Sequence, residues 1–255
     1  MGTTEIRRIL KDDVDTPVKV DGDEQVAEDG WRVPIHEAHH LPPVRPTKIL
    51  CVHLNHISRV HEFQTTLPAA PTYFHKPVSS LNRHLGDVVR PERCRWLNYE
   101  GEVVIVIGQP CRNIDPTEAG HYIGGYTIGN DFGLHDFRDT DAGSMLRVKG
   151  SDTLCPVGPG IVSGWDFHGK RIRTLVNGEV AQDGTTDEMT WDMHYLVADL
   201  ARTITLFPGD LIFSGTPANS RPVEPGDLVT VEVEGLGGLT NRIVSGENPI
   251  RDDCG

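Results

Sequence analysis

Short runs of apolar residues, most of them no longer than a strand, dominate the chain after residue 47. Residues 48–54, 100–107 and 171–176 are rich in aliphatic and β-branched side chains, which is typical of buried strands. Asn177-Gly178 follows the last of these runs and predicts a tight hairpin turn. Pro208-Gly209-Asp210 and Pro225-Gly226-Asp227 each precede a further apolar run, so each predicts a turn that leads into a strand.

Two segments predict helices. Asp115, Pro116 and Glu118 combine a helix N-cap, a proline at the first helical position and an acid three residues after the cap. We therefore expect a short helix that begins here and ends at Gly124-Gly125. Residues 191–204 repeat apolar side chains at helical spacing and predict the longest helix. The whole pattern predicts a mainly β fold with two helices (α+β), arranged as a single roll or sandwich.

The first 46 residues differ in composition from the rest. They hold ten Asp and Glu against six Lys and Arg, and they end in the proline-rich text of residues 41–46. Polar and apolar side chains alternate over residues 16–20, which predicts a short strand. The sequence therefore predicts a small acidic, β-rich lobe over residues 1–46, joined by a stiff connection to a main domain over residues 47–255.

Composition excludes several classes of protein. The 255 residues include 24 Lys and Arg against 37 Asp and Glu, a formal net charge of −13, which argues against nucleic acid as a partner. The chain has neither a basic cluster for anionic lipid nor an apolar run long enough to span a bilayer, so no membrane partner is expected. Five cysteines without a Cys-x-x-Cys pair, and an N-terminus without a signal-peptide core, predict reduced thiols and a cytoplasmic protein.

The most informative segment is Tyr-Glu-Gly-Glu-Val-Val-Ile-Val-Ile over residues 99–107. Strand periodicity places Glu100 and Glu102 on one face, about 7 Å apart along the backbone, at the entrance of an otherwise apolar strand. Two carboxylates there repel each other, so they either take up protons or are compensated by positive charge. Oxygen-only ligands favour a hard divalent cation such as Mg²⁺ or Mn²⁺. The alternative interpretation is a solvated edge strand.

Further candidates are weaker when taken singly. Asp131 follows a predicted helix, turn and strand, where a carboxylate can serve as a third metal ligand or simply as a turn or cap residue. Lys149 next to Gly150 is either a site cation or a surface lysine. Gly215 and Thr216 end an apolar run, where amides and a hydroxyl can hold a carboxylate or merely form a turn. Nucleotide-binding loops and serine-hydrolase motifs are absent from the sequence.

Seven short segments occur together in one order along residues 48–244. They are 74–81 (Phe-His-Lys-Pro-Val-Ser-Ser-Leu), 99–102, 125–131 (Gly-Tyr-Thr-Ile-Gly-Asn-Asp), 149–153 (Lys-Gly-Ser-Asp-Thr), 176–179, 208–210 and 214–217 (Ser-Gly-Thr-Pro). In this combination the chain resembles the fumarylacetoacetate hydrolase family. The resemblance implies a mixed β-sandwich roll, a homodimer, and a catalytic domain over residues 47–255 that uses Mg²⁺ or Mn²⁺.

The resemblance also implies roles for individual residues. It assigns Glu100, Glu102 and Asp131 as metal ligands, and it places Lys149 facing the substrate. The residues expected to bind the substrate are Lys76, Ser79, Gly215 and Thr216, which lie in the matching segments, and Arg147, which lies two residues before one of them.

Within the family the chain is most similar to the isomerase and decarboxylase branch that acts on homoprotocatechuate breakdown products. Small hydrolytic and decarboxylating members carry a His–Glu pair that activates water, but here the His position is Arg59, while Glu62 is retained. His61 or His56 is a possible substitute, and His135 stands where the family usually has Arg.

The resemblance therefore implies a metal-dependent isomerase, with decarboxylation as a further reaction, of 2-hydroxymuconate-type or 2-oxo-diene dicarboxylates in aromatic catabolism. A metal-stabilised enolate would form from a small anionic 2-oxo acid, with Glu62 or His61 moving the proton and Lys149 adding positive charge. The alternative is a C–C hydrolase of the acylpyruvate or fumarylacetoacetate type. A third interpretation, a non-catalytic member that merely keeps the fold, is disfavoured by the retained acids and Lys149.

Overall fold

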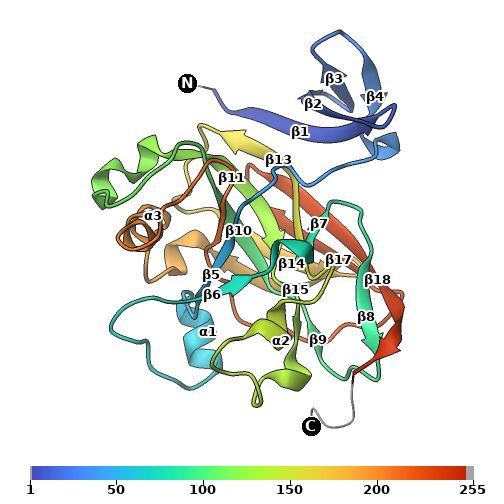
Figure 1. Ribbon diagram of the computed structural model, residues 1–255. Helices are drawn as coiled ribbons and strands as arrows, with labels where there is room; N and C mark the ends of the chain where they lie inside the picture. The colour runs from blue at the N-terminus through green and yellow to red at the C-terminus, as the bar shows by residue number, and fades with distance from the viewer. Residues whose placement is uncertain (1, 251–255) are drawn as a thin grey trace.

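The computed structural model describes residues 2–250, and two β-sheets form most of it (Figure 1). The larger sheet contains, in spatial order, β4 (Arg32–Pro34), β3 (Glu24–Ala27), β2 (Val14–Asp21), β1 (Thr4–Lys11), β13 (Cys155–Ser163), β11 (Ile123–Asn130), β10 (Gly101–Ile107), β16 (Leu211–Phe213), β5 (Ile49–His53) and β6 (Thr72–Lys76), with β7 (Leu81–Arg83) paired to β13. The smaller sheet contains β15 (Glu179–Thr185), β14 (Arg171–Val176), β17 (Leu228–Val233), β18 (Gly237–Pro249) and β8 (Val88–Glu92).

A third, two-stranded sheet and several short helices complete the fold. The small pair is β9 (Leu97–Asn98) with β12 (Gly133–Leu134). The α-helices are α1 (Ile57–Glu62), α2 (Leu146–Lys149) and α3 (Met193–Ala201). The 3₁₀ helices are Ile35–Glu37, Val78–Ser80, Pro116–His121, His135–Phe137 and Thr186–Glu188. No helix within residues 2–250 is long and apolar enough to cross a membrane.

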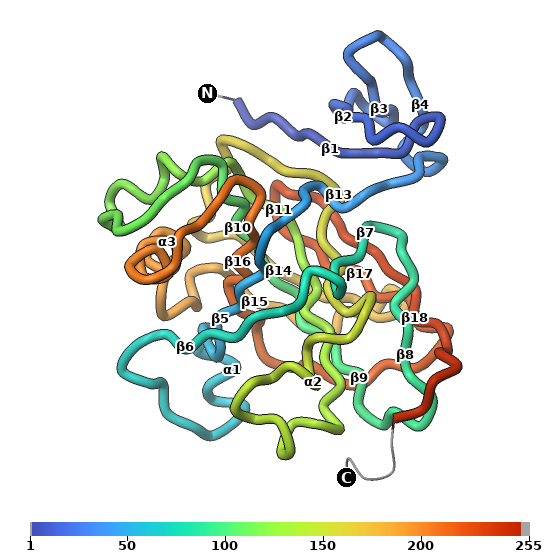
Figure 2. The backbone as a smooth tube through the Cα atoms, viewed as in Figure 1, coloured from blue at the N-terminus to red at the C-terminus, as the bar shows by residue number. Residues whose placement is uncertain are grey.

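The strand β10 lies at the centre of the large sheet and is buried along its whole length (Figure 2). Val103, Ile105 and Ile107 pack against the smaller sheet and α3, in the largest hydrophobic cluster. The opposite face carries Val104 and Val106, which pack with residues of β5, β13 and β16. The predicted mainly β fold of the mixed β-sandwich roll type is therefore confirmed, with β10 covered on both faces as its apolar pattern indicated.

Most predicted strands and turns are confirmed. Residues 48–54 correspond to β5, residues 100–107 to β10 and residues 171–176 to β14. Asn177 and Gly178 both have positive φ angles and form the tight turn between β14 and β15. The two Pro-Gly-Asp turns lead directly into β16 and β17.

The helix predictions need correction. Asp115 caps a helix by accepting from the Thr117 amide, but the helix is a 3₁₀ helix that ends at His121, and Gly124-Gly125 lies in β11. Gly124 belongs there because its Cα approaches the backbone of Gly108 too closely for a side chain. The longest helix, α3, is confirmed but spans only Met193–Ala201. The prediction of two helices missed α1 and α2, since elements this short show no helical periodicity.

The N-terminal strands continue the large sheet. β1 pairs with β13 along Thr4–Arg7, and β2 to β4 follow outward from it (Figure 1). Residues 16–20 fall inside β2 as expected. A division of the chain at residue 46 stays a prediction. Four of the five cysteines, Cys51, Cys94, Cys111 and Cys155, are buried free thiols, and Cys254 lies outside the described residues.

Two histidine rings meet beneath the N-terminal strands. His40 is fully buried, and its ring packs edge-to-face on His84, with 4.9 Å between the ring centroids. The amide of Thr240 donates to Nδ1 of His84 at 3.1 Å, so this nitrogen must be unprotonated. Burial and the positive charges of neighbouring Arg7 and Arg83 lower the pKa of both rings, that of His84 to about 3.

We expect the free energy of unfolding to fall as the pH falls below about 6.5, because the unfolded chain then binds protons at these two rings that the folded chain does not. Each such proton adds a slope of up to about 1.4 kcal/mol per pH unit. Urea unfolding of the wild type and of His84→Gln at intervals between neutral pH and pH 4 measures this slope. A variant as acid-sensitive as the wild type would contradict the assignment to this histidine pair.

Candidate metal centre and active site

A cavity of about 420 Å³ opens where several chain segments converge at one end of the large sheet. His53 at the end of β5, Arg59 of α1 and Phe74 of β6 line one part of it. Lys149 of α2 and Gly215 after β16 line another. Segments separated by more than a hundred residues therefore contribute to one concave site, as is typical of ligand-binding cavities.

Three carboxylates lie at the inner end of this cavity. Glu100, Glu102 and Asp131 each offer an oxygen atom, and these atoms lie within 4.8 Å of one another. Glu102 and Asp131 are almost completely buried, whereas Glu100 is partly exposed to the cavity. The pairing of adjacent strands explains the convergence, because Gly101 of β10 lies opposite Asn130 of β11. The Asp131 amide then donates to the Glu100 carbonyl at 2.8 Å.

Two buried lysines hold Asp131 from different sides. Lys149 Nζ lies 2.9 Å from Asp131 Oδ2 and 2.7 Å from Glu100 Oε2, and it also donates to the Asp131 carbonyl at 2.8 Å. Lys76 Nζ lies 2.5 Å from Asp131 Oδ1 and donates to the carbonyls of Phe132 and Leu154. Lys149 lines the cavity, but Lys76 is fully buried and lies outside the lining. The structure therefore places Lys76, predicted to bind substrate, where it orients Asp131.

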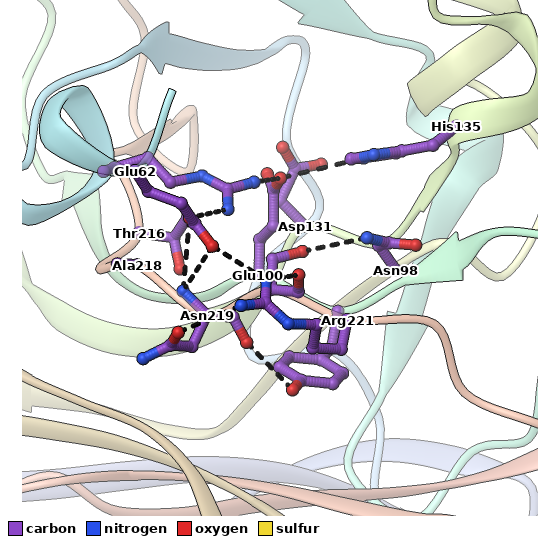
Figure 3. A network of polar contacts seen from close by, with 12 residues as sticks. Glu62, Asn98, Glu100, Asp131, His135, Thr216, Ala218, Asn219 and Arg221 are labelled. Atoms are coloured by element: carbon purple, nitrogen blue, oxygen red, sulfur yellow. Dashed lines mark hydrogen bonds and ion pairs between the residues drawn. The ribbon is translucent and has the colours of Figure 1, made fainter. Parts of the chain in front are cut away.

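Arg59 connects the carboxylate cluster to α1. Its guanidinium donates to Glu62 Oε2 at 2.6 Å and to Glu100 Oε1 at 3.0 Å. Glu62 also accepts from the Asn219 amide at 3.2 Å and from Arg221 at 2.7 Å (Figure 3). Arg59 thus pairs with both acids, at the position where the family resemblance implies a His in hydrolytic members.

Burial and charge act differently on the acids. Burial and the adjacent Asp131 and Glu100 raise the pKa of Glu102 well above its ordinary range. Burial also opposes ionisation of Glu100, but Lys149 and Arg59 outweigh it and lower the pKa of Glu100 to about 2. Burial likewise disfavours the charged form of Lys149, yet Asp131 and Glu100 raise its pKa. Glu102 is therefore the acid whose negative charge is least compensated by the protein.

The donor set fits a hard divalent cation. All three candidate ligands are carboxylates, they converge from two adjacent strands, and all three face the cavity. Such oxygen ligands suit Mg²⁺ or Mn²⁺ rather than a thiolate-seeking metal. A cation at this position would also relieve the repulsion felt by Glu102.

Gly215 and Thr216 border the same cluster. The Gly215 amide donates to Glu102 Oε2 at 2.6 Å, and Gly215 adopts a φ of 98° that disfavours any other residue. The Thr216 hydroxyl accepts from Gln182 at 3.0 Å. Both residues line the cavity, but the Gly215 amide is already engaged with Glu102, so it orients that carboxylate.

Other residues expected at the site lie elsewhere. His61, Ser79 and Arg147 are exposed and do not contribute to the cavity lining. Glu62 also lies outside the lining, held by its contacts with Arg59, Asn219 and Arg221.

Sequence reasoning missed much of the cavity wall. His53, Phe63, Arg138 and Met145 line it, together with His135, whose Nε2 lies 3.8 Å from Glu100 Oε1. The signal for His135 was the family position at which it replaces Arg, and the signal for Arg138 was proximity, since it lies seven residues after Asp131.

Comparison with known proteins supports these observations. The model of the fumarylacetoacetate (FAA) hydrolase C-terminal family matches residues 48–244. The chain is 40% identical over 197 residues to the 4-hydroxyphenylacetate degradation bifunctional isomerase/decarboxylase of Escherichia coli, covering 76% of this chain and 46% of that protein. It therefore spans about half the length of that relative. A mitochondrial oxaloacetate tautomerase of Homo sapiens is 34% identical over 224 residues, covering 83% of this chain and 71% of that protein.

Solved structures agree with the sequence comparison. The crystal structure of 5-carboxymethyl-2-hydroxymuconate delta-isomerase from Mycobacterium smegmatis superposes with a TM-score of 0.88 at 34% identity, covering 96% of this chain and all of that one. The similarity extends well beyond the matched segments and includes the N-terminal strands. The match of the family model over most of the chain, the identities to relatives and the shared fold together show that this chain belongs to the fumarylacetoacetate hydrolase family of enzymes.

Proposed function

We propose that this chain is a divalent-metal-dependent isomerase of 2-hydroxymuconate-type or 2-oxo-diene dicarboxylates in aromatic catabolism. The observation that carries the proposal is the cluster of three carboxylates and Lys149 in a cavity that Arg59, paired with Glu62, also lines. The names of the Escherichia coli and Mycobacterium smegmatis relatives support an isomerase, and the Escherichia coli name also supports a decarboxylase.

Glu100, Glu102 and Asp131 would hold Mg²⁺ or Mn²⁺. When bound, the cation supplies Lewis-acid stabilisation of the negative charge that develops on a 2-oxo acid as a proton leaves the neighbouring carbon. Lys149 is buried and lines the cavity, so its positive charge would stabilise the same negative charge on the substrate. Phe74 and Met145 line the wall and exclude water from the reacting carbons.

The proton carrier is best sought among the cavity histidines. Glu62 lies outside the cavity lining and is held by Arg221 and Arg59, and His61 also lies outside the cavity. His53 and His135 line the cavity, and burial lowers the pKa of both, that of His135 to about 4. Both rings are therefore neutral near pH 7 and able to accept a proton. We assign the proton transfer to one of these two rings rather than to Glu62 or His61.

The second candidate function is C–C hydrolysis of an acylpyruvate. It requires a base that activates water, and the family resemblance implies a His–Glu pair for this role where Arg59 pairs with Glu62 instead. Isomerisation requires only the movement of a proton. The arrangement around Arg59 therefore favours the isomerase over the hydrolase.

Product analysis tests the proposed function directly. The protein is loaded with Mg²⁺ or Mn²⁺ and incubated with a 2-hydroxymuconate-type diacid, and the products are followed by absorbance and mass spectrometry. Isomerisation leaves the mass unchanged, decarboxylation removes the mass of carbon dioxide, and C–C hydrolysis yields two smaller acids whose masses together equal substrate plus water. Turnover that survives complete removal of metal by EDTA, or conversion only by addition of water, would overturn the proposal.

Replacing Arg59 by His is expected to introduce acylpyruvate hydrolysis at least about tenfold above the wild type, because an imidazole next to Glu62 supplies a base for water. The measurement is the rate of acid release from an acylpyruvate with Mn²⁺. Arg59→Gln is the matched control, since it removes the charge without providing a base. Equal hydrolysis by the two variants would show that Arg59 does not decide between the reactions.

A further inference from the structure

The cavity runs from a buried inner end to an exposed mouth. Glu102 and Asp131 at the inner end are 2% and 1% exposed. Thr65, Arg138 and Asp139, which line the same cavity, are exposed to solvent. A substrate with one end at the carboxylate cluster therefore extends towards the mouth.

Two guanidinium groups pack on one aromatic ring between these ends. Arg59 lies 4.4 Å and Arg138 lies 4.7 Å from the centroid of Phe63. Such stacking fixes the plane of a guanidinium and leaves its N–H groups directed outward along its edge. Phe63 therefore holds Arg138 at the cavity wall although Arg138 is exposed.

The two arginines differ in their acidic partners. Arg59 is committed to Glu62 and Glu100. Within residues 2–250, Arg138 makes no ion pair with a carboxylate, and Asp139, which also lines the mouth, is not within ion-pair distance of it. The pKa of His53, which lines the cavity, is lowered mainly by burial, and the charges of Glu100, Lys149 and Asp131 also act on it. The positive charge of Arg138 adds to this lowering, so Arg138 acts electrostatically inside the cavity. Arg138 is thus a stacked cation with free donors facing the cavity mouth.

We propose that Arg138, held on Phe63, binds the distal carboxylate of a dianionic substrate and so makes the enzyme selective for 2-oxo dicarboxylates over 2-oxo monocarboxylates. A guanidinium matches a carboxylate with two parallel hydrogen bonds, a geometry that a neutral or methyl end group cannot use. The inference rests on the proposed function only in placing the 2-oxo acid end of the substrate at the carboxylate cluster.

Binding measurements test the inference without requiring turnover. The Mn²⁺-loaded protein is titrated calorimetrically with 2-oxoheptanedioate and with 2-oxoheptanoate, which differ only in the distal carboxylate. We expect the wild type to bind the diacid at least about tenfold more tightly, as one bidentate charged contact would provide. Arg138→Gln should reduce this preference to less than about threefold, with the affinity for the monoacid unchanged.

Arg242→Gln is the matched control, because it removes the same charge from an exposed residue of β18 that does not line the cavity. It should keep the preference of the wild type. Equal binding of the two acids by the wild type, binding of neither, a preference retained by Arg138→Gln, or one lost equally in Arg242→Gln would each overturn the inference. An Arg138-dependent preference without isomerisation would instead support the inference and refute the proposed function.

Discussion

Replacing Glu102 by Gln is expected to raise the melting temperature of the metal-free protein while removing most of its activity with Mg²⁺ or Mn²⁺. Glu102 is 2% exposed and lies against Glu100 and Asp131, and within residues 2–250 no Lys or Arg is within ion-pair distance of it. Its hydrogen bond comes from the Gly215 amide, which an amide oxygen can accept equally well. Gln thus keeps the shape and removes the charge.

The sign of the stability change follows from proton binding. Burial and Asp131 raise the pKa of Glu102, so the folded chain holds this proton to higher pH than the unfolded chain does. The free energy of unfolding therefore falls as the pH rises through the raised pKa, and Gln removes this loss. We expect a gain of about 1–2 kcal/mol at pH 8, or a few degrees in melting temperature for a chain of this length.

Metal titration distinguishes a site that binds Mn²⁺ from one that has lost a ligand. The melting temperature of the wild type should rise with Mn²⁺ concentration by mass action, whereas that of Glu102→Gln should stay constant, and activity should fall on the order of a thousandfold. Glu232→Gln, which removes an acid from the ion pair with Arg173, is the control and should behave like the wild type. A variant that melts below the wild type in EDTA, or that keeps the Mn²⁺-induced shift, would contradict the assignment.

The carboxylate cluster was predictable because its geometry is set by local rules. Residues two apart on a strand share a face, which brought Glu100 and Glu102 together from sequence alone. Asp131 joins them because β10 and β11 are neighbouring strands with Gly101 opposite Asn130. The sequence placed Asp131 at the end of a strand, but only the resemblance to the family put it beside the two glutamates.

The rest of the cavity depends on packing between distant segments. Lys76 and Ser79 come from one matching segment, yet Lys76 points inward to Asp131 while Ser79 is exposed. Such divergence follows from the 3₁₀ helix Val78–Ser80, in which Ser79 lies and which no sequence periodicity predicts. Arg138 joins the site because the end of α1 brings Phe63 against it across more than seventy residues. Side-chain direction in short irregular elements is fixed by tertiary contacts, so sequence patterns do not predict it.

Replacing Lys149 by Met is expected to destabilise the metal-free protein by about 3 kcal/mol, because it leaves Glu100 and Asp131 buried without the cation that contacts both. Activity should fall at least about a hundredfold, since a buried positive charge at the cavity wall is lost. The measurements are urea unfolding in EDTA and with Mn²⁺, and the rate of isomerisation with Mn²⁺. Because a divalent cation acts on the same carboxylates, Mn²⁺ should restore much of the stability but little of the activity.

Lys76→Met separates two roles of a lysine at this site, which are to hold the carboxylates in place and to act on the substrate. Lys76 contacts Asp131 as closely as Lys149 does but lies outside the cavity lining, so its loss should cost similar stability in EDTA. With Mn²⁺ present, its activity should recover further than that of Lys149→Met, because Lys76 cannot reach the substrate. Equal and lasting loss of activity in both variants would mean that Lys149 acts only by holding the acids in place. Recovery in Lys76→Met alone would show that the charge of Lys149 acts on the substrate itself.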